Sequence, residues 1–512
     1  MTGPACKRRI RRKTDEMVFE KPQGLIDVTQ RKPATRPALR LAGFAVAAGL
    51  AAGPAASETL ESALAKAYGG NPQLNSSRAN VRATDEGVAI AKSGYRPTVS
   101  VEADIGAQYF EGKFGTSGSG AASAAGAGAV AGAVATGGAG VTRFTTLPSG
   151  AGVTVNQTLF NGFQTDNNTR RAESNVYSQR ESLRSTEMTV LYSGVTSYMN
   201  VLSNTATLEL NRNNVEVLEE QLRQTRDRFN VGEVTRTDVA QAEARLAGAR
   251  SQVSVAESNL RTSIGTYRQN IGVEPRQLAP GRPLDRYVPK NLDSAIAIGL
   301  QEHPQILSAL HAVDAAEAQV KVLEGILYPT VSLQGAVRQA FDQQLPGYNA
   351  VTASIVGRVS IPLYQGGQEY AQIRQQKEVV GQTRIQADLV RDQVRAQVVD
   401  FWGRLEAAKA QVIAAQAQVQ ANEVALNGVR EEARVGQRTT LDVLNAQQEL
   451  LNARVNLITA QRDRVIYSYG VVQAIGRLTV RYTAVPVAAY SAKVHYDQVK
   501  DLWYGVRSPD GR

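Results

Sequence analysis

Apolar and polar residues alternate along four segments of the chain, and this alternation predicts β-strands. In "TVSVEADIGAQY", which starts at Thr98, every second residue is apolar, and the residues between them are polar or glycine. A pattern with a period of two gives a strand one apolar face and one polar face. The four expected strands cover residues 98–110, 150–160, 330–341 and 350–363.

Two long stretches without proline predict helices of unusual length. Residues 163–230 and 367–434 contain no proline and few glycines. A helix of roughly 65 residues extends about 100 Å at a rise of 1.5 Å per residue, which is too long for a compact domain. The many alanines suit close lateral packing in the manner of a coiled coil. Shorter helices are expected at residues 59–95, 236–271, 291–327 and 439–475.

Each long helix is followed by nearly the same short turn. The two turns read "RFNVGEVTRTDVAQA" and "EARVGQRTTLDVLNA" and lie 204 positions apart. Glycine after a helical run supplies the left-handed residue that ends a helix. A threonine followed three positions later by an acidic residue predicts a capping box that begins the next helix. Each turn is therefore interpreted as the tip of a helical hairpin.

The repeated turns belong to a duplication of most of the chain. "LESALAKAYGGNPQL" aligns with "LDSAIAIGLQEHPQI" at an offset of 232 residues, and a second block aligns at an offset of 204. The expected repeats are residues 58–272 and 291–476, joined by a linker at 273–290 and followed by a tail at 477–512. The glycine- and alanine-rich residues 115–140 account for the difference in offset and are interpreted as a surface loop.

The basic character of the chain is concentrated in its first 57 residues. The net charge is +10, and residues 1–57 carry +7 of it. This leader has a basic region, an apolar run that begins at Leu39 and small residues up to Ser57, which is the pattern of a cleaved secretory signal. The remaining chain is nearly neutral, so its composition does not indicate nucleic-acid binding.

Residues that perform chemistry are scarce. Cys6 is the single cysteine, and the three histidines are well separated in the sequence. His303 precedes Pro304 as Asn71 precedes Pro72, so His303 is interpreted as a turn residue. No phosphate-binding loop and no nucleophile with a partnered base is evident. The sequence therefore predicts a protein that is not an enzyme and that needs neither a metal nor a cofactor.

The expected strands suit a membrane. Strands of about 9 to 13 residues can cross a bilayer at a tilt, and aromatic residues cluster near the ends of these strands. A sheet in hydrocarbon must close, and known barrels begin at about eight strands. Four strands per chain cannot close alone, so several chains are expected to share one barrel. A soluble sheet with one exposed face is the alternative interpretation of the alternation.

The residues then resemble the TolC-type outer membrane efflux and secretion proteins, over about residues 58–476. The resemblance rests on "AYGGNPQL", "GYRPTVS", "LFNGF" and "RFNVGEVTRTDV" in this order, and on the duplication. The tail "KVHYDQVKDLWYGV" is similar to that of alphaproteobacterial members.

The resemblance implies an α+β membrane protein: a homotrimer whose 12-strand outer-membrane β-barrel, with four strands from each chain, continues into a 12-helix periplasmic α-barrel of long hairpins. It implies a passive exit duct that serves type I secretion or multidrug efflux. An adaptor (membrane fusion) protein and an inner-membrane pump of the ABC or RND type would open the duct at its tips. An exported coiled-coil structural or adhesion protein with a small β region is the rival hypothesis.

The resemblance also assigns roles to residues at the two tips. It places Asp442 and Asn445 at a pore constriction, although the family carries a second aspartate where this chain has Asn445. Thr237, Asp238 and Arg438 match links that hold the gate closed, and Ala433 stands where the family has a tyrosine. Asp238 and Asp442 are equally well explained as capping residues. Adaptor docking is implied for Gly232, Thr235, Gly436 and Thr439.

Overall fold

A computed structural model describes residues 58–113, 141–343, 346–509 and 511 of the chain. The expected leader at 1–57 and the expected loop at 115–140 lie outside the described residues. The α-helices are α1 (Leu60–Gly70), α2 (Pro72–Lys92), α3 (Gln164–Asn230), α4 (Arg236–Ile271), α5 (Leu292–Glu302), α6 (Pro304–Glu324), α7 (Gln368–Arg434), α8 (Thr440–Ala474) and α9 (Ala492–Val499). The strands are β1 (Thr98–Ile105), β2 (Gln108–Lys113), β3 (Val141–Thr146), β4 (Ser149–Asn161), β5 (Thr330–Phe341) and β6 (Asn349–Ser360), and short 3-10 helices cover Ser93–Tyr95 (η1), Asp285–Tyr287 (η2) and Gly325–Leu327 (η3).

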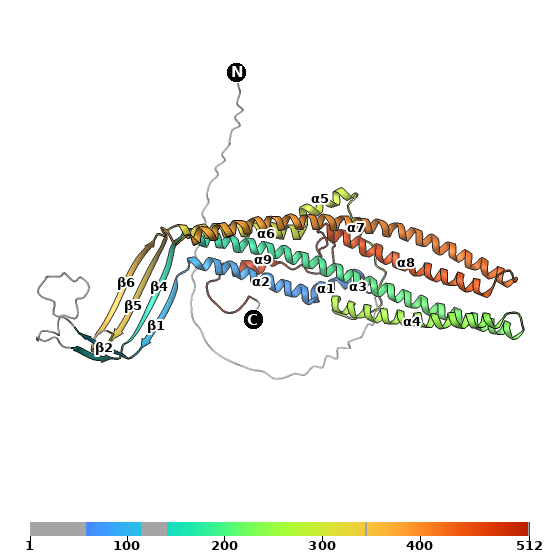
Figure 1. Ribbon diagram of the computed structural model, residues 1–512, viewed down its shortest axis with the longest axis horizontal. Coiled ribbons are helices and arrows are strands. Elements are labelled where there is room, and N and C mark those ends of the chain that lie inside the picture. Colours follow the sequence, from blue (N-terminus) through green and yellow to red (C-terminus); the bar gives the residue numbers. More distant parts are fainter. Residues whose placement is uncertain (1–57, 114–140, 344–345, 510, 512) are drawn as a thin grey trace, which may run out of the picture. The chain divides into compact units, whose positions relative to one another are not determined.

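Four strands form one antiparallel sheet in the order β1-β4-β5-β6 (Figure 1). Val101 lies opposite Val153, which in turn lies opposite Val337. Residues that face each other across antiparallel strands point to the same side of the sheet. All three valines are exposed, so one face of the sheet is both apolar and uncovered by the rest of the chain. The other face is polar and includes an ion pair at 2.5 Å between Arg338 and Asp104. The register thus confirms the alternation predicted from the sequence.

The first expected strand is divided in the structure. β1 ends at Ile105, and β2 pairs with β3 in a separate two-stranded ribbon. β3 is not among the strands expected from the alternation. At the division, the Gly106 amide donates a hydrogen bond to the Pro148 carbonyl at 2.8 Å. Pro148 itself has no amide hydrogen to extend the ladder, so the pairing changes here.

In each repeat, the one helix expected before the first strand is also divided in two. The first is interrupted at Asn71, whose extended backbone (φ −66°, ψ 122°) separates α1 from α2. Its side-chain oxygen accepts hydrogen bonds from the amides of Gln73 and Leu74. His303 occupies the same position between α5 and α6 and caps α6 through its ring, which confirms its interpretation as a turn residue. The cause is the proline that follows each residue, because proline disfavours the helical conformation in the residue before it.

α3 and α7 each contain 67 residues. α4 lies alongside α3, and α8 lies alongside α7, so the chain contains two long hairpins (Figure 1). None of the helices in the described part of the chain has the length and apolar character needed to cross a membrane.

The main apolar core surrounds the middle of α3. Tyr198 is fully buried there, and its hydroxyl oxygen lies 2.8 Å from the Glu58 carbonyl oxygen and 2.6 Å from the Ala279 carbonyl oxygen, so that its single hydrogen is shared between these two acceptors. Residues from the 273–290 segment and from the segment after α8 pack on the same core, as do α1, α4 and α8. The core members from these segments are Leu278, Leu284, Tyr287, Val288, Leu478, Val480, Tyr482, Val485, Val487 and Tyr490. Both segments therefore pack against the helices at the same height, near the middle of α3.

Candidate functional site

The two hairpin tips have the same backbone construction. Gly232 and Gly436 adopt left-handed φ values of 82° and 79°. In the first tip the Glu233 amide donates to the Arg228 carbonyl at 2.9 Å, and in the second the Gln437 amide donates to the Glu432 carbonyl at 2.9 Å. These bonds, together with those of the two glycine amides, form the Schellman motif that ends a helix. The predicted role of each glycine in ending a helix is confirmed at both tips.

Each tip continues into a capping box. The Asp238 carboxylate accepts hydrogen bonds from the Thr235 amide at 2.9 Å and hydroxyl at 2.7 Å, and the Asp238 amide donates to the Thr235 hydroxyl oxygen. Asp442 and Thr439 repeat this arrangement with distances of 3.0 and 2.9 Å. The hydrogen bonds from the threonines lower the pKa of both aspartates. Both caps therefore contribute stability at neutral pH and lose that contribution as the pH falls through the lowered pKa.

The charges beside the two tips are reversed. In the first hairpin Arg228 lies four residues before Gly232, and it pairs at 2.9 Å with Glu233, which follows that glycine. In the second hairpin Glu432 precedes the turn and pairs with Arg438 after it at 2.8 Å. The Glu432 carboxylate raises the pKa of Arg438. The two tips thus have the same backbone conformation, but the order of the basic and acidic residue around the turn is reversed.

A groove of about 630 Å³ separates the two tips. Asp238 and Arg438, which were predicted to link the hairpins, both line it. In the chain each is engaged within its own hairpin, Asp238 with Thr235 and Arg438 with Glu432. Ala433 also lines the groove. Thr237 is exposed at the start of α4. The structure therefore brings Asp238 and Arg438 to one groove without joining them directly, whereas Thr237 is not among the residues that line it.

The two hairpins contact each other above the tips, in the second turn of α8 and the third turn of α4. Leu444 of α8 is buried against residues of the first hairpin, which are Leu218, Leu222, Ala242 and Leu246. Beside it, Arg245 of α4 donates a hydrogen bond from its guanidinium to the side-chain oxygen of Asn445 at 2.8 Å. Asn445, which was predicted to face the constriction, thus also contacts the first hairpin. Sequence reasoning did not select Arg245, because it lies outside the repeated turn and no local pattern marks it.

The backbone at both tips is exposed. Gly232, Thr235, Gly436 and Thr439 are all exposed. Among the described residues, no group of three or more histidine, cysteine, aspartate or glutamate side chains could hold a metal ion. The tips therefore present backbone and charged side chains to solvent.

The match to a protein family covers both repeats. Residues 63–272 and 296–477 match the family described as outer membrane efflux protein. The chain belongs to this family. An outer membrane efflux protein resides in the outer membrane, which accounts for the exposed apolar face of the sheet.

Individual members of the outer membrane efflux family support this placement. The chain is 42% identical to outer membrane efflux protein BepC of Brucella suis over 461 residues, which cover 90% of the chain and 94% of BepC. It is 26% identical to outer membrane protein TolC of Escherichia coli, over 57% of the chain and 62% of TolC. The solved outer membrane channel CmeC of Campylobacter jejuni shares the fold, with a TM-score of 0.68 and 17% identity over 86% of the chain and 89% of CmeC.

Proposed function

We propose that three copies of this chain form a continuous exit duct of an efflux or secretion system. The observation that carries the proposal is the combination, in one chain of this family, of a sheet with an exposed apolar face and two long helical hairpins. The duct is passive, so energy is supplied at the inner membrane.

The edges of the sheet support a trimer. β1 and β6 lie at the two edges of the four-stranded sheet, where each has a neighbour on one side only. Backbone groups at an open edge cannot remain unpaired in hydrocarbon. When β6 of one copy pairs with β1 of the next, three copies close a barrel of twelve strands, which is within the range of known barrels. Each copy then contributes four helices, α3, α4, α7 and α8, to a ring of twelve helices that ends at the tips.

The tips are the proposed docking site for an adaptor protein, through which an inner-membrane pump of the ABC or RND type opens the duct. Gly232, Thr235, Gly436 and Thr439 present this surface. The groove between the tips supports this proposal, because Asp238 and Arg438 both line it and would be within reach of another hairpin that enters it. Opening would then require a rearrangement of the second hairpin relative to its neighbours.

Replacement of Asp442 by asparagine is expected to reduce the preference of the pore for cations several-fold. Three Asp442 carboxylates near the pore axis would attract cations by their summed field. The measurement is the reversal potential of single trimers under a salt gradient. Asp238→Asn is the matched control for loss of a cap, because it removes the same kind of cap from the first hairpin, and its resting conductance is recorded as well because Asp238 is also a proposed gate residue. Equal changes in both variants would assign Asp442 to capping alone.

The proposed function is tested with purified protein in planar lipid bilayers. We expect a trimer that migrates as such until it is heated and that conducts ions in discrete steps. A trimer without any conductance would instead favour an exported structural or adhesion protein. Cargo is then identified by deletion of the gene, with secreted proteins and drug susceptibility compared in the same strains. The name of BepC, an efflux protein, makes drug susceptibility the first measurement.

A further inference from the structure

The segment that follows α9 exposes a cluster of apolar and aromatic side chains. Trp503 is 65% exposed, Tyr504 91% and Val506 fully exposed, and Leu502 is also exposed. Four exposed side chains of this kind within five residues form a concentrated apolar surface, which is unusual for a segment that faces water. The cluster Leu502, Trp503, Tyr504 and Val506 is here named the tail cluster.

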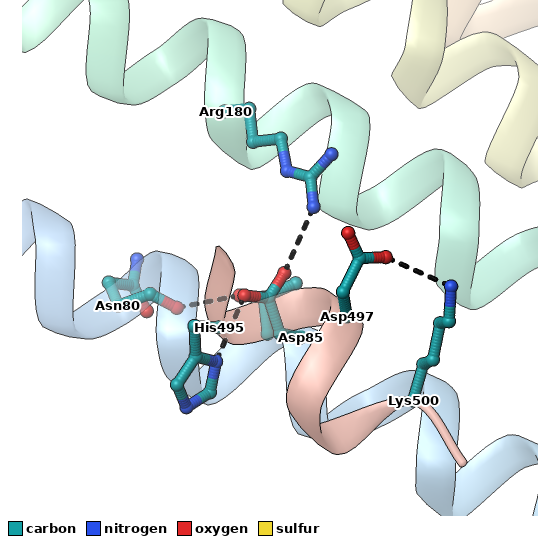
Figure 2. A network of polar contacts seen from close by, with 7 residues as sticks. Asn80, Asp85, Arg180, His495, Asp497 and Lys500 are labelled. Carbon is teal, nitrogen blue, oxygen red and sulfur yellow. Dashed lines mark hydrogen bonds and ion pairs between the residues drawn. The ribbon is translucent and has the colours of Figure 1, made fainter. Parts of the chain in front are cut away.

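α9 is fixed to α2 immediately before the tail cluster. His495 is joined to Asp85 of α2 by a hydrogen bond of 3.1 Å between Nδ1 and a carboxylate oxygen, and Arg180 of α3 forms an ion pair with the same carboxylate at 3.6 Å (Figure 2). Asp85 is fully buried, and this burial raises its pKa. Val499 at the end of α9 is also buried. The point from which the segment leaves the helices is therefore well defined.

Polar contacts then hold the segment at the junction of α2 with β1. Lys92 at the end of α2 pairs with Asp501 at 2.7 Å. Arg96 donates a hydrogen bond to the Leu502 carbonyl at 2.6 Å, and its guanidinium lies 5.0 Å from the centre of the Trp503 ring. β1 begins at Thr98, two residues after Arg96. The tail cluster consequently lies beside the point where the first strand enters the sheet.

Other exposed aromatic side chains occur at this end of the sheet. Phe163 follows the end of β4, Tyr328 precedes β5, and Tyr364 follows β6. All three are more than half exposed. Aromatic residues at the ends of transmembrane strands mark the boundary between hydrocarbon and water. The tail cluster therefore continues an aromatic belt at the periplasmic end of the strands.

We propose that the tail cluster is an interfacial anchor, which inserts into the headgroup region of the periplasmic leaflet of the outer membrane. Its partner is a phospholipid surface. Trp503 and Tyr504 suit this region because each combines an apolar ring with a polar group. Lys92 and Arg96 hold the segment in place, and the aromatic and aliphatic groups contact lipid. The proposal rests on the membrane placement of the sheet in the proposed function.

Tryptophan fluorescence tests the anchor directly, because the chain contains two tryptophans, Trp402 and Trp503. The variant Trp402→Phe retains Trp503 alone. We expect phospholipid brominated near the headgroup to quench the emission of its reconstituted trimer about twofold, and more strongly than phospholipid brominated near the chain end. The matched control is Trp503→Phe, which retains Trp402. Trp402 of α7 packs against a buried cluster that α5, α6, α7 and α8 form together, and it is expected to be unaffected.

Three outcomes decide the proposal. Quenching of Trp503 by lipid supports the anchor. Quenching by aqueous acrylamide but not by lipid overturns it, and so does protection from both quenchers, which would place Trp503 against a neighbouring copy. If Trp402→Phe does not assemble, the quenching of Trp503 is obtained by subtracting the emission of the Trp503→Phe trimer from that of the unsubstituted trimer. Ion conductance of the same trimers is recorded in parallel, so that a conducting trimer without quenching refutes the anchor and leaves the proposed function intact.

Discussion

Replacement of Gly162 by alanine is expected to destabilise the protein by about 3 kcal/mol or more and to prevent normal trimer formation. Gly162 connects β4 to α3 and adopts a left-handed φ of 65°. A methyl group there would collide with the backbone carbonyl oxygen of Gly325 and would lie 2.9 Å from the Tyr328 Cβ. Since the obstacle is backbone, no side-chain rotation can relieve it. The measurement is the temperature at which the trimer dissociates.

Gly366→Ala is the matched control for this prediction. Gly366 aligns with Gly162 in the second repeat and has a similar φ of 76°, but a methyl group there would meet no atom within 4 Å. Only the backbone strain of a left-handed alanine then remains, at about 1 kcal/mol. Equal losses in the two variants would contradict the argument, because they would show that strain alone determines the cost.

Replacement of Arg245 by alanine is expected to raise the resting conductance of the trimer about tenfold. The Arg245–Asn445 hydrogen bond joins the two hairpins above the tips, between the third turn of α4 and the second turn of α8. At about 0.5 kcal/mol for each partly exposed bond, three copies contribute about 1.5 kcal/mol to the closed arrangement. That free energy corresponds to about a tenfold change in the ratio of closed to open trimers. The measurement is single-trimer conductance in a planar bilayer without a partner protein.

The control for Arg245 is Arg250→Ala. Arg250 lies on the same helix and pairs with Glu219 of α3 at 2.8 Å, so it links two helices within the first hairpin. Its loss should leave the resting conductance unchanged. Arg438→Ser and Asp238→Ala are measured beside it, because the proposed gate link predicts higher resting conductance in both. If Arg245→Ala matches the unsubstituted protein while these two conduct more, the hairpins are held at the tips instead.

Local patterns in the sequence were sufficient to predict the tips. Gly232 and Gly436 end helices, and Thr235 and Thr439 begin them, through contacts that span only a few residues. The alternation of the strands similarly specified which residues share a face, because that depends on the strand's period of two. The same local information also contained the breaks at Asn71 and His303, since a proline follows each.

Some features could not be read locally. The change of pairing between β1 and β2 depends on Pro148, more than forty residues further along the chain, and β3 lacks a clear alternation. Asp85 and His495 are separated by 410 positions in sequence yet form one buried contact. Neither residue stands in a pattern that would select it, because each is ordinary on its own helix.

The sequence by itself determined that this protein has two similar hairpins, four alternating main strands and two capped tips, because these features follow from helix and strand periods and from contacts within a turn. Only the tertiary structure decided that Arg245 meets Asn445 and that Trp503 lies beside Arg96. Both contacts depend on the rotation and level at which distant segments pack. Those quantities are set by the sum of many apolar contacts along the helices rather than by any short run of residues.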